Sequence, residues 1–127
     1  MTKRALLPIM VVAGVLHIAK PAMSQIGGSG SIQGVVSDPS GAMIPGATVV
    51  AENTATGVRT TRQTTEAGYY VLSPLPAGEY SVTVTAGGFQ TLVQQKLVVD
   101  ALSTVGLNLA LKIGAANDQV TATDPPP

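Results

Sequence analysis

Apolar and polar residues alternate strictly in two segments of this chain, and this pattern limits the folds that it can adopt. In EYSVTVTA the apolar side chains occupy every second position: Tyr80, Val82, Val84 and Ala86. A period of two residues is typical of a β-strand with one buried and one solvated face. The segment TVGLNLALKI repeats the pattern, with these side chains inward: Val105, Leu107, Leu109 and Leu111. Because no window after residue 24 shows a convincing helical stripe, we predict an all-β fold.

Further alternating runs and regularly spaced turns extend this pattern. SIQGVVS and ATVVAEN alternate, VRTTRQTT alternates more weakly, and FQTLVQQKLVVD is predicted to be a strand of ambiguous register. Glycine-containing turns separate the runs: DPSG, IPGA, ATGV, EAGY, PAGEY and AGGF. In DPSG the proline presets the backbone angle that a type I turn needs. Short strands separated by turns every eight to twelve residues or so favour an antiparallel β-sandwich.

SPLPAGEYSV, from Ser73 to Val82, is predicted to be a corner between two strands. Pro74 and Pro76 cannot donate ladder hydrogen bonds, so we expect them to end the first strand. Gly78 would give the backbone the freedom to turn into the next strand. The large side chains around the corner are expected to face the core: Tyr70, Leu72, Leu75 and Tyr80.

The N-terminal segment, residues 1–24, has the composition of a secretory signal peptide. Lys3 and Arg4 precede the apolar run ALLPIMVVAGVLHIA. Small residues occupy the positions before a cleavage site: Ala22 and Ser24. We therefore predict that the mature chain begins at Gln25. The alternative, an uncleaved membrane anchor, needs about 20 apolar residues, and this run is shorter.

Removing that segment leaves a mildly acidic chain. The full sequence has seven Lys plus Arg and seven Asp plus Glu. Lys3, Arg4 and Lys20 leave with the signal, so four cations remain against seven acids. Nucleic-acid binding usually requires a basic stripe, and four scattered cations do not form one. We expect no nucleic-acid partner.

The residue types that carry most enzyme chemistry are missing. The chain has no cysteine, and its single histidine, His17, lies in the predicted signal peptide. The mature chain therefore has no Ser-His triad, thiol nucleophile or imidazole metal ligand. Its carboxylates are scattered, so no calcium loop is expected, and Asp38 is interpreted as a turn residue. We predict no catalytic activity, no metal and no cofactor.

Four motifs between Gly30 and Phe89 stand out together: GVVSDPSGAMIPGATV, EAGYYV, PLPAGEYSVTV and GGF. Their characteristic residues are Asp38, Gly41, Pro45, Gly46, Gly68, Tyr70, Leu75, Pro76, Gly78, Tyr80 and Phe89. The combination resembles the carboxypeptidase regulatory-like domain, which is related to the transthyretin-like domain of metallocarboxypeptidases and to Cna B-type modules. The resemblance implies a single seven-stranded antiparallel β-sandwich, prealbumin-like or Cna B-like, with a carbohydrate-binding-like fold over residues 25–114. Residues 115–127 are expected to form a flexible tail or linker.

The resemblance also implies a function. Such domains are noncatalytic and often follow the signal peptide of TonB-dependent outer-membrane receptors, ahead of the plug and barrel. We therefore expect an accessory module of a truncated or split receptor, in the periplasm or at the outer membrane. Its expected partner is another protein or the downstream plug and barrel, and NDQVTATDPPP resembles the strand that leads toward such a plug. The alternative is an independent secreted carbohydrate-binding or adhesion module.

One residue is the candidate for contact with carbohydrate. Strand alternation points Tyr69 away from Tyr70, and carbohydrate sites commonly use an exposed aromatic face. Tyr69 is therefore the predicted glycan contact. The Cna B-type comparison also raises a Lys-Asn isopeptide crosslink, but the first strand, SIQGVVS, has no lysine, so none is expected.

Overall fold

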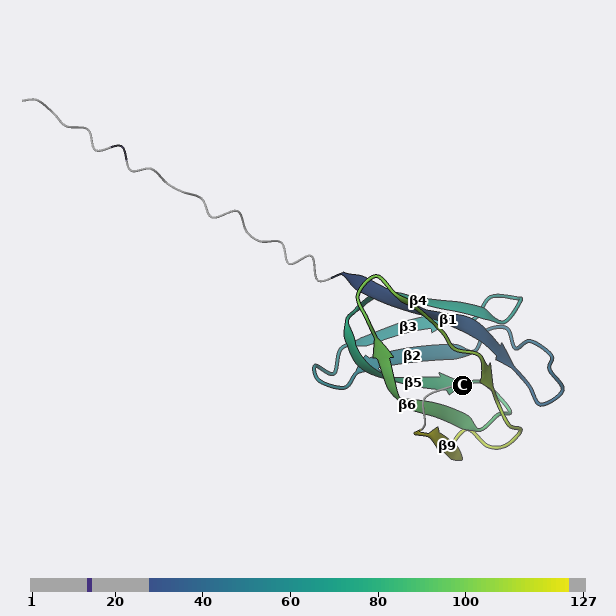
Figure 1. Cartoon of the computed structure of the whole chain (residues 1–127). Helices are drawn as coiled ribbons and strands as arrows, with labels where there is room; N and C mark the ends of the chain where they lie inside the picture. Colours follow the sequence, from purple (N-terminus) through teal and green to yellow (C-terminus); the bar gives the residue numbers. More distant parts are fainter. Residues whose placement is uncertain (1–13, 15–27, 124–127) are drawn as a thin grey trace, which may run out of the picture.

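Two β-sheets pack face to face in the computed structural model, which describes Gly14 and residues 28–123 (Figure 1). The strands are β1 (Ser29–Ser37), β2 (Thr48–Asn53), β3 (Arg59–Gln63), β4 (Tyr69–Pro76), β5 (Gly78–Thr85), β6 (Thr91–Val99), β7 (Thr104–Gly106), β8 (Leu109–Ala110) and β9 (Gln119–Ala122). The all-β prediction is confirmed. The described residues include no helix that could cross a membrane. The predicted signal peptide, apart from Gly14, lies outside them.

The first sheet is built around β1. β4 pairs with one side of β1 in antiparallel orientation, and β7 and β8 pair with β1 in parallel orientation. The parallel pairs arise because the Asp100–Ser103 turn brings the chain back to the start of β1, where the Leu102 N–H donates to the Ser29 carbonyl at 3.1 Å. From there β7 must run in the same direction as β1. The expectation of a purely antiparallel sandwich is therefore wrong.

The second sheet has the order β3-β2-β5-β6-β9. Its first four strands are antiparallel neighbours, and β9 pairs with β6 in parallel orientation. Residues 115–127, expected to be a tail or linker, thus contribute a strand at Gln119–Ala122. The described residues form nine strands rather than seven. The number of strands is larger than predicted because β9 is added and because TVGLNLALKI divides into β7 and β8.

The inner faces of both sheets share one hydrophobic core. The four side chains predicted to line the corner are all buried: Tyr70, Leu72, Leu75 and Tyr80. Of the inward side chains predicted in the two alternating segments, Ala86 and Val105 are partly buried, and the others are buried: Val82, Val84, Leu107, Leu109 and Leu111. Full burial of an aliphatic side chain of this size contributes roughly 1.5–3 kcal/mol. The core therefore holds both sheets together without a disulfide, since the chain has no cysteine.

A β-bulge in β6 explains why the register of FQTLVQQKLVVD could not be assigned from the sequence. Ser81 of β5 faces two residues of β6, Gln95 and Lys96. Lys96 has a φ of 57°, a left-handed conformation that residues with a side chain rarely adopt. The extra residue shifts the alternation by one position, so a period of two cannot be followed through the strand.

Both prolines of SPLPAGEYSV lie in β4, so the expectation that they end the strand is confirmed for Pro76 and wrong for Pro74. Pro74 belongs to a bulge opposite Ser31, and Pro76, the last residue of β4, pairs with Ser29. β4 is an edge strand, and an edge strand tolerates residues that lack an N–H donor. Only Ala77 separates β4 from β5.

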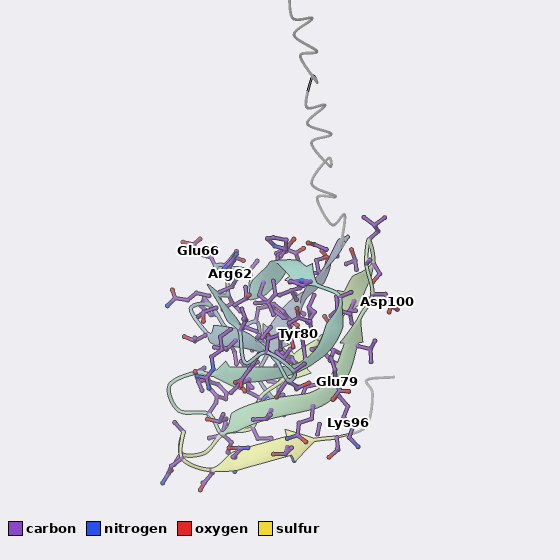
Figure 2. All side chains as sticks on the ribbon, turned by 90° about the vertical axis from the view of Figure 1, so that its left-hand side faces the viewer. Arg62, Glu66, Glu79, Tyr80, Lys96 and Asp100 are labelled. Atoms are coloured by element: carbon purple, nitrogen blue, oxygen red, sulfur yellow. The ribbon has the colours of Figure 1, made fainter. Side chains whose placement is uncertain are left out.

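The connections lie at two opposite ends of the sandwich. The corner end carries the start of β1, the β2–β3 turn, the β4–β5 corner and the β6–β7 turn; it lies on the left in Figure 1 and faces the viewer in Figure 2. The loop end carries the β1–β2, β3–β4, β5–β6 and β8–β9 connections. Most of the residues singled out by the sequence motifs fall into two groups, one at each end.

Candidate functional site

The characteristic motif residues do not converge on one site. One group lies at the loop end: Asp38, Gly41, Pro45, Gly46, Gly68 and Phe89. A second group lies at the corner end: Leu75, Pro76, Gly78 and Tyr80. Tyr70 is buried between the sheets. Among the residues that the structure describes, no group of three or more His, Cys, Asp or Glu could hold a metal ion.

Asp38 organises the first turn of the loop end. Its carboxylate accepts hydrogen bonds from the Ser40 N–H at 2.8 Å, the Ser40 hydroxyl at 2.6 Å and the Ala42 N–H at 3.0 Å. The Ser40 hydroxyl is the largest cause of a pKa of Asp38 below its ordinary value, because these donors stabilise the charged carboxylate. The Gly41 N–H closes the turn by donating to the Asp38 carbonyl at 3.0 Å. Asp38 has the turn role that the sequence predicts.

Gly68 lies where the β3–β4 turn touches the β1–β2 connection. Its φ is 72°, and a Cβ atom there would lie 2.8 Å from the Met43 Cβ and 2.9 Å from the Val36 carbonyl oxygen. Both the backbone angle and the close approach require glycine. Gly41 and Gly46 also have positive φ, but a Cβ atom on either would meet nothing within 4 Å.

The other two motif residues of the loop end are less constrained. Pro45 is exposed. Phe89 is half-buried against the core and forms a β-bridge with Ile113. The loop end therefore consists of turns that close the sandwich, with Asp38 and Gly68 as its most specific residues.

Tyr80 and Pro76 hold the β4–β5 corner together. The Tyr80 hydroxyl donates to the Pro76 carbonyl at 2.6 Å, and the Tyr80 side chain is buried. The role predicted for Gly78 is corrected, because its φ is not positive. A Cβ atom on Gly78 would instead lie 3.0 Å from the Asn53 Nδ2. Glycine is needed here for close packing against the neighbouring β2–β3 turn.

Asn53 organises that turn, although the sequence motifs do not single it out. It is 8% exposed, and its Oδ1 accepts hydrogen bonds from the Ala55 N–H at 2.9 Å and the Thr56 N–H at 3.1 Å. The available signal was the asparagine of ENTATG, since asparagine side chains commonly bond the backbone two residues later. Only the fold shows that Asn53 also meets Gly78.

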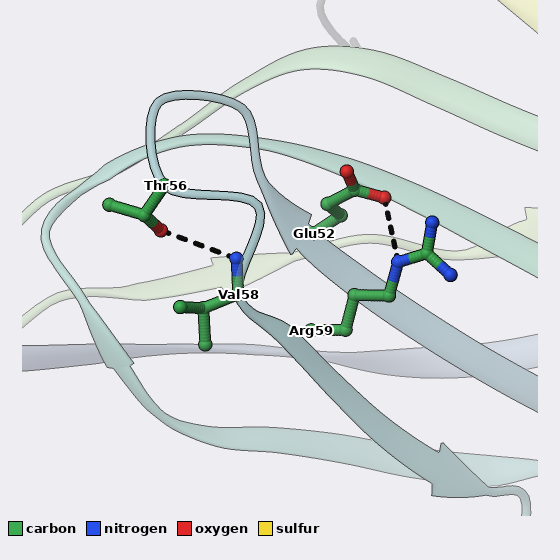
Figure 3. Close-up of polar contacts among 4 residues, drawn as sticks. All are labelled: Glu52, Thr56, Val58 and Arg59. Carbon is green, nitrogen blue, oxygen red and sulfur yellow. Dashed lines mark hydrogen bonds and ion pairs between the residues drawn. The ribbon is translucent and has the colours of Figure 1, made fainter.

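Two further contacts stabilise the same turn (Figure 3). The Val58 N–H donates to the Thr56 Oγ1 at 3.3 Å. On the outer face of the hairpin, the Arg59 Nε lies 3.0 Å from the Glu52 Oε2. Such an exposed ion pair contributes about 0–1 kcal/mol, so the backbone contacts of Asn53 matter more for the turn.

A hollow of about 180 Å³ lies between this turn and the corner. Its lining consists of Asn53, Thr56, Val58, Thr60, Pro76 and Tyr80, none of which is charged. Figure 2 looks onto this end, with Tyr80 near the centre of the view and Asp100 toward its right-hand edge. The lining offers apolar contact and a few hydroxyl or amide groups, without an acid, base or nucleophile pair.

The closest contact at any described glycine joins Gly34, Tyr70 and Leu107. Gly34 pairs with Tyr70 across the β1–β4 ladder, and the Tyr70 hydroxyl donates to the Leu107 carbonyl. A Cβ atom on Gly34 would lie 1.9 Å from that same carbonyl oxygen. Burial raises the pKa of Tyr70. Tyr70 is one of the characteristic motif residues. Gly34 is not, although it is the first residue of GVVSDPSGAMIPGATV, because the alternation alone gives no sign of this contact.

Tyr69 lies on the outer face of β4, as strand alternation predicts. Its side chain is 39% exposed, and its hydroxyl donates to the Gln33 Oε1 at 3.1 Å. Val71, the next outward residue of β4, is 36% exposed. Beside Gln33 on β1 lies Gly106 of β7, where a Cβ atom would meet nothing within 4 Å. The result is an uncharged surface with one aromatic ring and one amide.

Comparison with known proteins identifies one family. A family model described as the carboxypeptidase regulatory-like domain matches residues 31–112. The match includes both motif groups and Tyr69. Comparison with curated protein sequences found no match.

Solved structures share the fold at low sequence identity. A putative carbohydrate binding protein from Bacteroides uniformis is 20% identical with a TM-score of 0.55, over 66% of this chain and 41% of its own. The TIE protein of Bacillus anthracis is 23% identical with a TM-score of 0.58, over 68% and 17%. Wild-type catechol 1,2-dioxygenase from Acinetobacter radioresistens is 15% identical with a TM-score of 0.57, over 76% and 56%.

This chain thus spans less than two thirds of each of these three proteins, and the likeness concerns the fold alone. The three descriptions differ from one another, as expected for a sandwich that carries many functions.

Proposed function

Because the chain belongs to the carboxypeptidase regulatory-like domain family, which its residues 31–112 match, we propose that it is an exported, noncatalytic accessory module. Its proposed place is the periplasmic N-terminus of a TonB-dependent outer-membrane receptor. The observation that carries the proposal is the order of the chain: a segment with signal-peptide composition, residues 1–24, comes directly before the family domain. The proposed partner is the plug and barrel of the receptor.

The path of the chain supports a module joined to its neighbours at one end. β1 begins at the corner end, where Ser29 pairs with Pro76. β9 runs parallel to β6 and therefore toward the same end (Figure 1). The described chain thus enters at the corner end, and its last strand points toward that end and stops beside Gln94, midway along β6.

Export is tested by producing the full chain with a C-terminal tag in a Gram-negative host. We expect the tagged protein in the periplasmic fraction, with an intact mass that begins at Gln25. Ser24→Arg should block the cleavage, because signal peptidase needs a small residue there, whereas Ser24→Ala serves as the matched control. Retention in the cytoplasm with residues 1–24 still attached would contradict the proposal.

The receptor context has its own test. The reading frame downstream of the Pro127 codon should continue into a plug and barrel. A stop codon at that position would instead favour an independent exported module.

The alternative function is carbohydrate binding or adhesion, with Tyr69 as the glycan contact. It is favoured by the exposed Tyr69 ring beside the Gln33 amide on an uncharged sheet face. A glycan array should show ligands that bind the parent and Tyr69→Phe, which keeps the ring, but not Tyr69→Ala. Equal binding by the parent and Tyr69→Ala would remove this candidate.

A further inference from the structure

β9 covers only part of an edge strand. β6 extends from Thr91 to Val99, and β9 pairs with its first four residues, Thr91–Gln94. An edge strand presents unpaired backbone groups and can template pairing with another chain. The two halves of β6 are protected from such pairing in different ways.

The second half of β6 has its own protection. Lys96 lies in the bulge with a φ of 57°, so the strand is both bent and charged there. A bulge and a lysine are two devices that discourage edge pairing. Edges elsewhere carry similar devices: the Arg62 guanidinium donates to the Ser73 carbonyl of β4 at 3.1 Å. Thr91–Gln94 has no proline, charge or bulge. Pairing with β9 covers this half of the edge instead.

β9 is held to this edge by few contacts. None of its side chains is buried, and only Val120 and Ala122 are half-buried. Just before it, the Thr91 hydroxyl donates to the Ala116 carbonyl at 2.7 Å and the Thr91 N–H donates to the Asp118 carbonyl at 2.9 Å. β5, by contrast, buries Tyr80, Val82 and Val84 in the core. Releasing β9 should therefore cost much less than unfolding the sandwich.

We propose that the Thr91–Gln94 edge of β6 is a strand-binding site, and that β9 occupies it reversibly. The ligand it fits is an extended peptide segment that runs parallel to β6 and carries small or β-branched uncharged residues, as QVTA does. Backbone hydrogen bonds provide the affinity in this mode of recognition. The site does not depend on the receptor context proposed above.

Hydrogen exchange on the full chain tests whether β9 opens independently. We expect the amides of β9 to exchange at least about 100-fold faster than those of Val82 and Val84, since strands with little buried area open locally. Equal exchange rates for β9 and β5 would overturn the proposal, because β9 would then open only with the whole domain.

A peptide with the sequence of residues 115–123, AANDQVTAT, tests the site directly. In full-length Val120→Pro the proline removes a backbone donor from β9 and should free the edge. The matched control, Thr123→Pro, places the same residue one position beyond the strand. We expect the dye-labelled peptide to bind Val120→Pro at least about tenfold more tightly than the parent or Thr123→Pro, because β9 competes for the site in those chains.

The amides of Thr91–Gln94 should shift in NMR spectra when the peptide binds. A folded Val120→Pro chain, with β5 amides still protected, that binds no peptide would refute the site. Loss of β5 protection in Val120→Pro would also refute it, because β9 would then be an integral part of the core. A control peptide that carries proline in place of Val120 should bind neither the parent chain nor the Val120→Pro chain.

Discussion

Gly34 shows how a single residue can decide the packing of both edges of a strand. β4 lies on one side of β1, and the Leu107 carbonyl approaches from the other. Without a side chain at Gly34, that carbonyl can lie close enough to accept the Tyr70 hydroxyl. The buried carbonyl is thereby satisfied, which avoids the cost of leaving a buried acceptor without a partner. Gly34, Tyr70 and Leu107 should therefore respond to substitution as a unit.

Gly34→Ala should destabilise the domain severely. The new Cβ would lie 1.9 Å from the Leu107 oxygen and 2.6 Å from its carbonyl carbon, so backbone must move, at a cost of about 3 kcal/mol or more. Gly106→Ala is the matched control, because nothing lies within 4 Å of its Cβ position; its effect should stay within about 0.5 kcal/mol. Urea unfolding of both variants measures the difference. Equal stability of the two would show that the contact at Gly34 is misplaced.

Tyr70→Phe should reduce the free energy of unfolding by about 1–3 kcal/mol, because it leaves the buried Leu107 carbonyl without its donor. The pH dependence gives a second readout. Burial raises the pKa of Tyr70 in the folded state, so its contribution is full below about pH 10, the unfolded pKa, and is lost as the pH rises further.

The stability difference between the parent and Tyr70→Phe should accordingly narrow above pH 10 in urea titrations. Tyr69→Phe, which changes an exposed hydroxyl, serves as the control substitution. A difference that stays constant up to pH 11 would argue against a buried Tyr70 hydroxyl.

At the scale of elements, the β4–β5 corner and the β2–β3 turn form one structural unit. Gly78 belongs to the corner, while Asn53 holds the turn through the N–H groups of Ala55 and Thr56. The Asn53 amide lies against the position that a Gly78 side chain would occupy. The effect of a substitution in one element on stability should therefore depend on the other element.

Gly78→Val should lower stability by about 1–3 kcal/mol, because its side chain would displace the Asn53 amide. Gly87→Val is the control, since a Cβ atom on Gly87 meets nothing within 4 Å. In a double-mutant cycle, Gly78→Val should cost less when Asn53→Ala is already present, as contacting residues are not additive. Thermal melts of the four chains measure this, and strict additivity would show that the corner and the turn are independent.

At the scale of the whole molecule, both sheets bury their inner faces in one core. Ile32 and Leu72 come from the first sheet, and Val49 and Val82 from the second. Neither sheet can leave without exposing the other, so the sandwich should unfold as one cooperative unit. β9 lies outside this unit because none of its side chains is buried.

Cooperativity can be measured by following amides of Ile32 and Val82 during urea unfolding by NMR. We expect the two midpoints to coincide within error, with the β9 amides losing their signals at lower urea. Separate midpoints for Ile32 and Val82 would mean that the two sheets unfold independently.

The fold class and the inward faces of the strands follow from the sequence alone. A period of two in EYSVTVTA identifies which side chains are buried, because alternation along a strand is a local property of the backbone. Turn chemistry is equally local, so Asp38 has the turn role that the DPSG motif predicts. The family resemblance also rests on these local motifs, and the match over residues 31–112 confirms it.

The strand pairing, the bulge and the reasons for two glycines depend instead on contacts between distant segments. The parallel pairing of β7, β8 and β9 depends on where distant segments arrive in space, which no local period records. The bulge at Lys96 breaks the alternation of β6, and the proper reason for Gly78 lies in Asn53, 25 residues away along the chain. Position 34 must be glycine because the Leu107 carbonyl lies against it. The chain reaches Leu107 only after it has crossed from the second sheet, at β6, to the first sheet, at β7. Local patterns specify which face of each strand is buried; contacts between distant segments specify which strand lies beside which.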